Sequence, residues 1–167
     1  MTTIYFIGKS QSLENALMNV EGVKIHYLHI DENKTYPENV TKFYDIVQKE
    51  NNDFGFVGIG LGGFYATRLA ERICVRSVLI DTVVDAYREI EWDDNKVAES
   101  YYPALVTTVT LKPLLLQTYK NPLAERFYAT EATYFDGDYQ KVAKDIVNFL
   151  HNKFTFNELL GNVLAKY

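Results

Sequence analysis

The sequence predicts an α/β protein, a three-layer sandwich in which helices cover both faces of a mostly parallel, six-stranded sheet. Short apolar runs rich in β-branched and aromatic residues alternate with longer segments whose apolar residues recur at helical spacing. A turn rich in glycine joins the third apolar run directly to a helix, which lets strand and helix approach closely. The length of 167 residues suits a single domain, expected to span 1–167.

The first half of the chain is expected to supply three strands and three helices. In order, these are a strand at 3–7, a helix starting near residue 13, a strand at 23–30, a helix at 36–49, a strand from residue 53 into the glycine turn, and a helix ending near residue 72. Ser10 or Ser12 can cap the first helix, because a hydroxyl there accepts a hydrogen bond from an N–H of the first turn. Pro37 suits the first turn of the second helix, where its missing N–H costs no hydrogen bond.

The second half continues the alternation of strands and helices, which a less regular segment, the excursion at 82–110, interrupts. In order, it predicts a strand at 75–80, a partly helical excursion at 82–110, strands at 111–118 and 130–135, and helices at 138–150 and 155–167. The excursion is locally acidic around Trp92. The last helix has a strong start signal, because Thr155 and Glu158 have the spacing of a capping box.

Composition and charge indicate the cellular compartment and exclude some classes of partner. The formal charge of -5 and the pI near 5.2 argue against a nucleic-acid binder, which concentrates Lys and Arg on one face. No apolar run reaches the roughly 18 residues that a membrane span needs. Cys74 is the single cysteine and cannot form an internal disulfide, and the chain starts without a basic leader, so we expect a cytoplasmic protein. The wealth of Lys, Asn, Tyr and Ile suits an AT-rich genome, such as a phage's.

The glycine turn fits two functional patterns. As Gly58-x-Gly60-x-x-Gly63 it fits a dinucleotide-binding fingerprint, with Asp81 at the distance expected of the acid that binds the ribose. As Gly58-x-Gly60-x-Gly62 it fits the nucleophile elbow G-x-S-x-G, with Gly60 standing where the serine should be. The remainder of the chain decides between them.

Three stretches carry a resemblance to a known family: Ile7-Gly8 at the end of the first strand, Tyr36-Pro37 at the start of a helix, and 58–67, which reads G-I-G-L-G-G-F-Y-A-T. They resemble the small bacterial esterases of the YqiA and YcfP type, in the α/β-hydrolase superfamily, which have His-Gly, Tyr-Pro and G-S-S-L-G-G-Y-Y-A-T at these places. The resemblance extends more loosely from Ile4 to about Leu150. It implies a minimal α/β-hydrolase fold and explains why the glycine turn follows the third strand, whereas a dinucleotide fingerprint usually follows the first.

The same resemblance implies that the catalytic triad is lost. In the family a serine attacks the acyl carbon, a histidine takes its proton and an acid orients the histidine. Here the serine position is Gly60, the acid position falls near Lys120 and the histidine position falls on Tyr139. Ile7 also replaces the histidine of the first loop.

We expect no other set of residues to replace the triad for conventional acyl transfer. The histidines are His26, His29 and His151, and none follows the fifth or sixth strand, where a base facing the elbow would come from. His26 and His29 would point to opposite faces of a strand, so they predict no metal site. Ser10, Ser12 and Cys74 are more simply explained as cap or core residues. Lys120 could pair with Asp136 or Asp138 at the carboxyl edge of the sheet.

The sequence therefore predicts a catalytically silent protein that acts by binding a protein partner or a second copy of itself, without a cofactor. A tyrosine-rich surface, the acidic excursion around Trp92 and the last helix are the candidate contact regions.

Two other functions stay open. A small-ligand binder would use a pocket of Gly8, Lys9, Ser10, Gly60 and Leu61, with the N–H groups of both glycines and of Leu61 facing an anion. An enzyme would either bind a dinucleotide at the glycine turn or hydrolyse its substrate with displaced catalytic groups.

Overall fold

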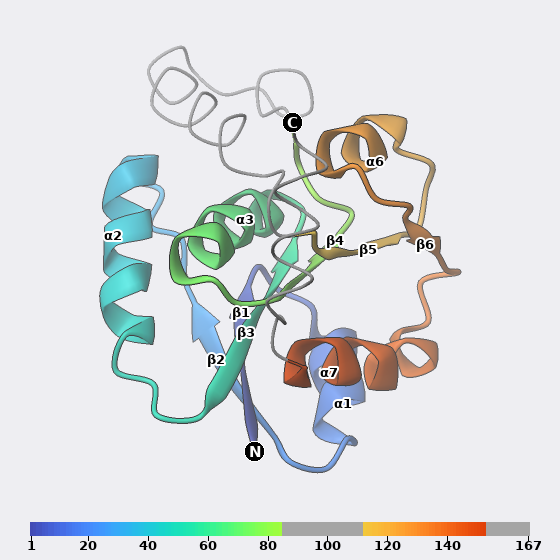
Figure 1. Ribbon diagram of the computed structural model, residues 1–167, viewed down its shortest axis with the longest axis horizontal. Coiled ribbons are helices and arrows are strands. Elements are labelled where there is room, and N and C mark those ends of the chain that lie inside the picture. The colour runs from blue at the N-terminus through green and yellow to red at the C-terminus, as the bar shows by residue number, and fades with distance from the viewer. Residues whose placement is uncertain (85–111, 153–167) are drawn as a thin grey trace.

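The computed structural model describes residues 1–84 and 112–152 (Figure 1). Its sheet has six strands in the order β2-β1-β3-β4-β5-β6, and every neighbouring pair is parallel. The strands are β1 (Thr2–Ile7), β2 (Val23–Leu28), β3 (Asp53–Ile59), β4 (Ser77–Ile80), β5 (Leu114–Gln117) and β6 (Thr133–Tyr134). The helices are α1 (Gln11–Met18), α2 (Tyr36–Val47), α3 (Leu61–Ile73), α6 (Pro122–Tyr128) and α7 (Ala143–His151), with a 3-10 turn at Tyr139–Lys141. The predicted α/β class and parallel sheet are confirmed.

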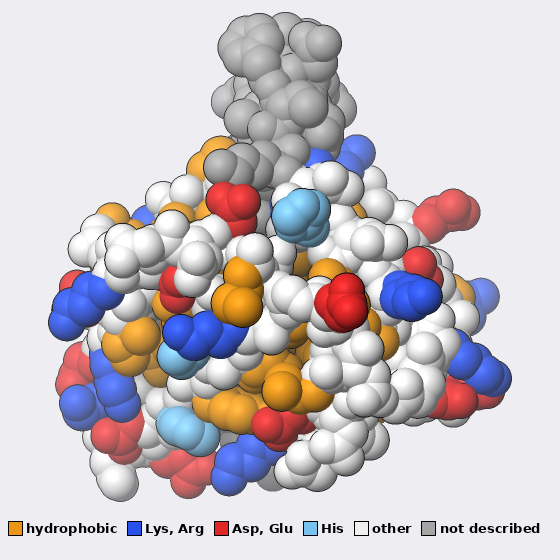
Figure 2. Space-filling view, turned by 90° about the horizontal axis from the view of Figure 1, so that it is seen from below, with side chains coloured by type: hydrophobic (Ala, Val, Ile, Leu, Met, Phe, Trp, Pro, Cys, Tyr) orange, Lys and Arg blue, Asp and Glu red, His pale blue; other side chains and the backbone are white. Residues whose placement is uncertain are grey.

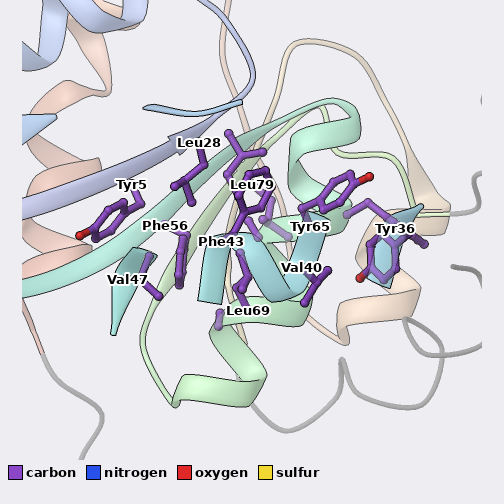
Figure 3. Packing of buried hydrophobic residues seen from close by; sticks show 14 of the residues in the cluster. Tyr5, Leu28, Tyr36, Val40, Phe43, Val47, Phe56, Tyr65, Leu69 and Leu79 are labelled. Carbon is purple, nitrogen blue, oxygen red and sulfur yellow. The ribbon is translucent and has the colours of Figure 1, made fainter. Parts of the chain in front are cut away.

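Helices cover both faces of the sheet and enclose two apolar clusters. One cluster joins α2, α3 and α6 to the sheet, and Figure 3 shows part of it. The other joins α1 and α7 to the opposite face. Side chains alternate between the clusters along β5, since Leu115 belongs to the first and Leu116 to the second. This alternation is what a strand buried on both faces requires.

Local signals account for the helix starts. The Ser10 hydroxyl accepts a hydrogen bond from the Leu13 N–H at 3.2 Å, which confirms the predicted cap of α1. Thr35 caps α2 in the same way for Glu38 and donates its hydroxyl to the Glu38 carboxylate at 3.1 Å. Pro37 lies in the first turn of α2, as predicted.

Two parts of the expectation differ from the structure. The predicted strands at 75–80, 111–118 and 130–135 are too long, because pairing is limited to β4, β5 and β6. Helix α6 was not predicted, although Asn121 caps it and Pro122 opens it. The excursion after Val84 and the last helix, with Trp92, lie outside the described residues.

The tyrosines are less exposed than predicted. Tyr5, Tyr36, Tyr65 and Tyr128 are buried and contribute nothing to the predicted tyrosine-rich surface, whereas Tyr119 and Tyr134 are exposed. Tyr128 forms a hydrogen bond with the Thr67 hydroxyl at 2.7 Å, which satisfies its hydroxyl inside the core.

The surface carries charges of both signs. On the face drawn in Figure 2, Lys and Arg lie interspersed with Asp and Glu, and the described residues there form no continuous basic stripe. Within 1–84 and 112–152, no helix has the length and apolar character needed to cross a membrane.

Candidate functional site at the carboxyl edge of the sheet

The five residues of the predicted pocket lie at one edge of the sheet. Gly8, Lys9 and Ser10 follow β1, while Gly60 and Leu61 follow β3. The two strands are parallel neighbours, so their carboxyl ends meet at the same edge. From there the chain enters α1 on one face and α3 on the other, which is the topological switch point where open α/β sheets bind ligands. We call these five residues the carboxyl-edge site.

Gly60 has the backbone of a nucleophile elbow without its side chain. Its φ is 56° and its ψ is -119°, a strained combination that glycine adopts most easily. Its carbonyl accepts hydrogen bonds from the Gly63 and Val83 N–H groups, which fix the turn between β3 and α3. A Cβ placed on Gly60 would meet no atom within 4 Å. The turn therefore keeps both the shape of the elbow and space where a side chain would stand.

The other glycines of the turn are explained by packing within the protein. A Cβ on Gly62 would lie 1.9 Å from the Ile7 carbonyl oxygen, and one on Gly58 would lie 2.6 Å from backbone atoms of Gly62 and Gly63. A Cβ on Gly63 would lie 2.1 Å from the Thr82 hydroxyl oxygen. Helix α3 thus begins directly against β1 and the end of β4. The glycine spacing that resembles a dinucleotide fingerprint needs no ligand to explain it.

Asp81 is engaged in a structural contact. Its carboxylate accepts hydrogen bonds from the Thr118 N–H at 2.9 Å and from the Thr118 hydroxyl at 2.7 Å. These bonds join the carboxyl ends of β4 and β5. Asp81 also has a φ of 46°, which Asp and Asn tolerate better than most residues. The ribose-binding role considered for Asp81 would have to displace both bonds.

Replacing Asp81 by Ala is expected to lower the free energy of unfolding by about 1–2 kcal/mol, because two partly exposed hydrogen bonds to a carboxylate are lost. Asp81→Asn is the matched control: its amide can keep both contacts and it tolerates the same backbone. Urea unfolding followed by circular dichroism measures the difference. Equal losses in the two variants would show that the contact with Thr118 contributes nothing to stability.

The backbone donors of the carboxyl-edge site are fewer than predicted. The Gly60 N–H donates to the Ile80 carbonyl at 2.9 Å, so the expectation that it faces an anion is wrong. Leu61 is the first residue of α3, and its N–H therefore has no acceptor within the helix. In a nucleophile elbow this N–H, from the residue after the nucleophile, helps to bind the oxyanion.

The three positions assigned to the lost triad follow β3, β5 and β6. Gly60 lies directly after β3, and the exposed Lys120 lies in the turn between β5 and α6. Tyr139 follows β6 and packs its ring on Phe135 at 5.6 Å between centroids. Their correspondence to the family's serine, acid and histidine stays a prediction. The predicted pairing of Lys120 with Asp136 is wrong, because Asp136 forms its ion pair with Lys141.

The histidines are distributed over different parts of the sheet. His26 stacks on Tyr5 in the middle of β2 and β1, with ring centroids 5.7 Å apart. His151 contacts the Thr2 hydroxyl through Nδ1 at 3.0 Å, at the amino end of β1. His29 alone follows a strand at the carboxyl edge, and that strand is β2, which β1 separates from the elbow. Among the described residues no group of three or more His, Cys, Asp or Glu could hold a metal ion.

Comparison with solved structures identifies the fold. Est1E from Butyrivibrio proteoclasticus is 13% identical with a TM-score of 0.64, and the match covers 90% of this chain and 86% of that one. A structure reported for the metagenome-derived lipolytic enzymes LipS and LipT is 8% identical with a TM-score of 0.62, covering 90% and 93%. An α/β hydrolase from Vibrio vulnificus is 16% identical with a TM-score of 0.54, covering 89% and 74%. The fold is that of the α/β hydrolases.

Sequence comparison gives the family. Residues 9–136 match the uncharacterised protein family UPF0227, so the chain belongs to that family. The predicted resemblance to esterases of the YqiA and YcfP type is confirmed at this level. No curated protein matches the chain in sequence.

Proposed function

We propose that this protein is a catalytically silent member of the α/β-hydrolase fold that acts by binding. The observation that carries the proposal is Gly60, which holds the backbone of the elbow at the nucleophile position without an atom that could attack an acyl carbon. The three histidines of the chain support it, because none of them follows β3 or its neighbours β1 and β4 at the carboxyl edge, where a base would face the elbow. Ser10 supports it too, since its hydroxyl is used to cap α1.

The geometry supports a small carboxylate as the ligand of the carboxyl-edge site. The space beside Gly60 could hold the carboxylate, and the Leu61 N–H at the start of α3 would donate to it. Such a ligand resembles the acid product of an ester hydrolase rather than its substrate.

A protein partner, or a second copy of the chain, is the second candidate. Tyr119 and Tyr134 are 52% and 46% exposed at the carboxyl ends of the neighbouring strands β5 and β6. Exposed aromatic side chains are frequent anchors of protein interfaces. Sedimentation of wild type and of the Tyr119→Ser, Tyr134→Ser variant tests self-association directly. A concentration-dependent mass that the variant lacks would support it, and a monomer at all concentrations would exclude the second copy.

The purified protein is expected to hydrolyse no short acyl ester above the buffer rate, because Gly60 cannot form an acyl-enzyme. Gly60→Ser is expected to stay inactive as well, since Lys120 and Tyr139 provide neither the acid nor the base. The serine fits the available space, but its positive φ should lower the free energy of unfolding by about 1–3 kcal/mol.

Two outcomes would contradict the proposal. Ester hydrolysis by wild type that a serine-reactive phosphonate abolishes would reveal a nucleophile elsewhere in the chain. Substantial turnover by Gly60→Ser would mean that a base does reach the elbow. Titration with short-chain carboxylates tests the ligand separately, and a saturable shift of the Leu61 amide resonance is the expected result.

A further inference from the structure

A hollow lies between the start of α1 and the end of β2. Its volume is about 320 Å³. Its lining residues are Lys9, Ser10, Gln11, Glu14, Tyr27 and His29. We call it the β2 hollow. It shares Lys9 and Ser10 with the carboxyl-edge site but contains no residue of β3 or α3.

Aromatic rings form one wall of the β2 hollow. Tyr27 and His29 are two residues apart, and their rings lie 6.0 Å apart with only 18° between the planes. The Tyr27 ring also packs on the buried Phe6, its register partner on β1, at 5.6 Å. Phe6 therefore supports the wall from the core, while the exposed His29 presents its ring toward solvent. A flat, supported aromatic surface of this kind suits a flat ligand ring.

Most polar groups around the wall already have a partner within the described part of the protein, and Lys9 is the exception among the charged ones. Burial of Tyr27, followed by its hydrogen bond and charge interaction with Glu14, raises the pKa of Tyr27 to about 12. The Tyr27 hydroxyl donates this hydrogen bond, so the Glu14 carboxylate already has a partner. Gln11 donates its amide to Asn15. Lys9 forms no ion pair among the described residues, so its ammonium is the charge that remains for a ligand.

We propose that the β2 hollow binds a single aromatic ring that carries an anionic group. The ring lies against the wall of Tyr27 and His29, and the anion contacts the Lys9 ammonium. The volume is at the lower end of the range for ligand pockets, which fits one ring and excludes a dinucleotide. This inference makes no use of Gly60 and is independent of the proposed function.

Titration of the full chain with 4-hydroxybenzoate, followed by amide NMR, tests this proposal. Saturable shifts are expected for residues 9–14 and 27–29. Two comparison compounds separate the contributions: 4-hydroxybenzamide keeps the ring but has no charge, and cyclohexanecarboxylate keeps the charge but has no aromatic ring. Both should bind at least about fivefold more weakly, because each lacks one of the two contacts.

Variants of the wall and of the cation assign these contacts to residues. Lys9→Met should weaken 4-hydroxybenzoate at least about fivefold while leaving 4-hydroxybenzamide unchanged. His29→Leu should weaken both aromatic compounds. The control is Lys24→Met, an exposed lysine of β2 that does not line the hollow, and it should bind as wild type does. The amide spectrum of each variant reports that it is folded.

Three results would overturn the proposal. One is the absence of saturable binding at ten millimolar ligand, and another is equal affinity for all three compounds. The third is a set of shifts centred on Gly60 and Leu61, which would locate the aryl acid at the carboxyl-edge site instead. That last result would leave the proposed function intact while removing the β2 hollow as a site.

Discussion

Gly62→Ala is expected to lower the free energy of unfolding by more than about 3 kcal/mol or to prevent folding, the upper end of what overpacking costs. The new Cβ would lie 1.9 Å from the Ile7 carbonyl oxygen and 2.6 Å from the Ile7 carbonyl carbon. Both are backbone atoms at the end of β1, a strand paired on both sides, so no side-chain rotation can relieve the clash. Helix α3 would have to move away from β1 at the elbow. Urea unfolding of the purified variant, or its failure to accumulate as soluble protein, measures the effect.

Gly22→Ala is the matched control for this prediction. Gly22 has a φ of +76°, but a Cβ there would meet no atom within 4 Å. The control therefore measures the cost of an unfavourable backbone conformation alone, roughly 1–2 kcal/mol. Gly62 lies within helix α3, so its cost is steric. A Gly62→Ala variant no less stable than Gly22→Ala would show that α3 does not lie against β1 as described.

Features encoded by neighbouring residues could be predicted from the sequence. The cap of α1 needs only Ser10 and the three residues after it, and the start of α2 needs only Thr35, Pro37 and Glu38. The glycine turn was recognisable because its tight backbone geometry imposes glycine at fixed spacing. The alternation of apolar runs then gave the α/β class, since each element buries its apolar residues with its own period.

Features that depend on distant partners could not be predicted. Asp81 and Thr118 are far apart in the sequence, and only the pairing of β4 with β5 brings them together. The Gly60 N–H appeared available for a ligand because the sequence does not show that Ile80 accepts its hydrogen bond. The β2 hollow likewise combines the loop after β1 with the end of β2.

Which tyrosines are buried could not be predicted from the sequence, for a related physical reason. A tyrosine hydroxyl disfavours burial unless it finds a hydrogen-bond partner, and its sequence neighbours do not reveal that partner. Tyr5 donates to Glu50 at 2.8 Å, and Tyr128 bonds to Thr67 from another helix. Helix α6, which positions Tyr128, did carry a local signal in Asn121-Pro122. Its seven residues are too few to show a clear helical period.

Phe43→Ala is expected to lower the free energy of unfolding by about 3–5 kcal/mol, the usual cost of truncating a buried phenylalanine. Phe43 is completely buried between α2 and the sheet, and its ring packs on Tyr65 of α3 at 5.8 Å between centroids (Figure 3). Removal of the ring leaves a cavity that these rigid elements cannot fill. Because α2 and α3 contact each other through this ring, its removal should also destabilise α3 locally. The first residue of α3 is Leu61 of the carboxyl-edge site.

Ile46→Ala, also in α2, is the control: it separates the cost of losing a buried side chain from any effect of the substitution on the helix itself. Ile46 is 42% exposed, so its truncation should change the free energy of unfolding by no more than about 0.5 kcal/mol. Urea unfolding of both variants gives the comparison, and amide exchange in α3 reports whether the loosening reaches the elbow. If the two variants lose equal stability, α2 does not bury the face that contains Phe43. If only Phe43→Ala loses stability and α3 exchanges faster, the α2–α3 contact is what holds the elbow helix in place.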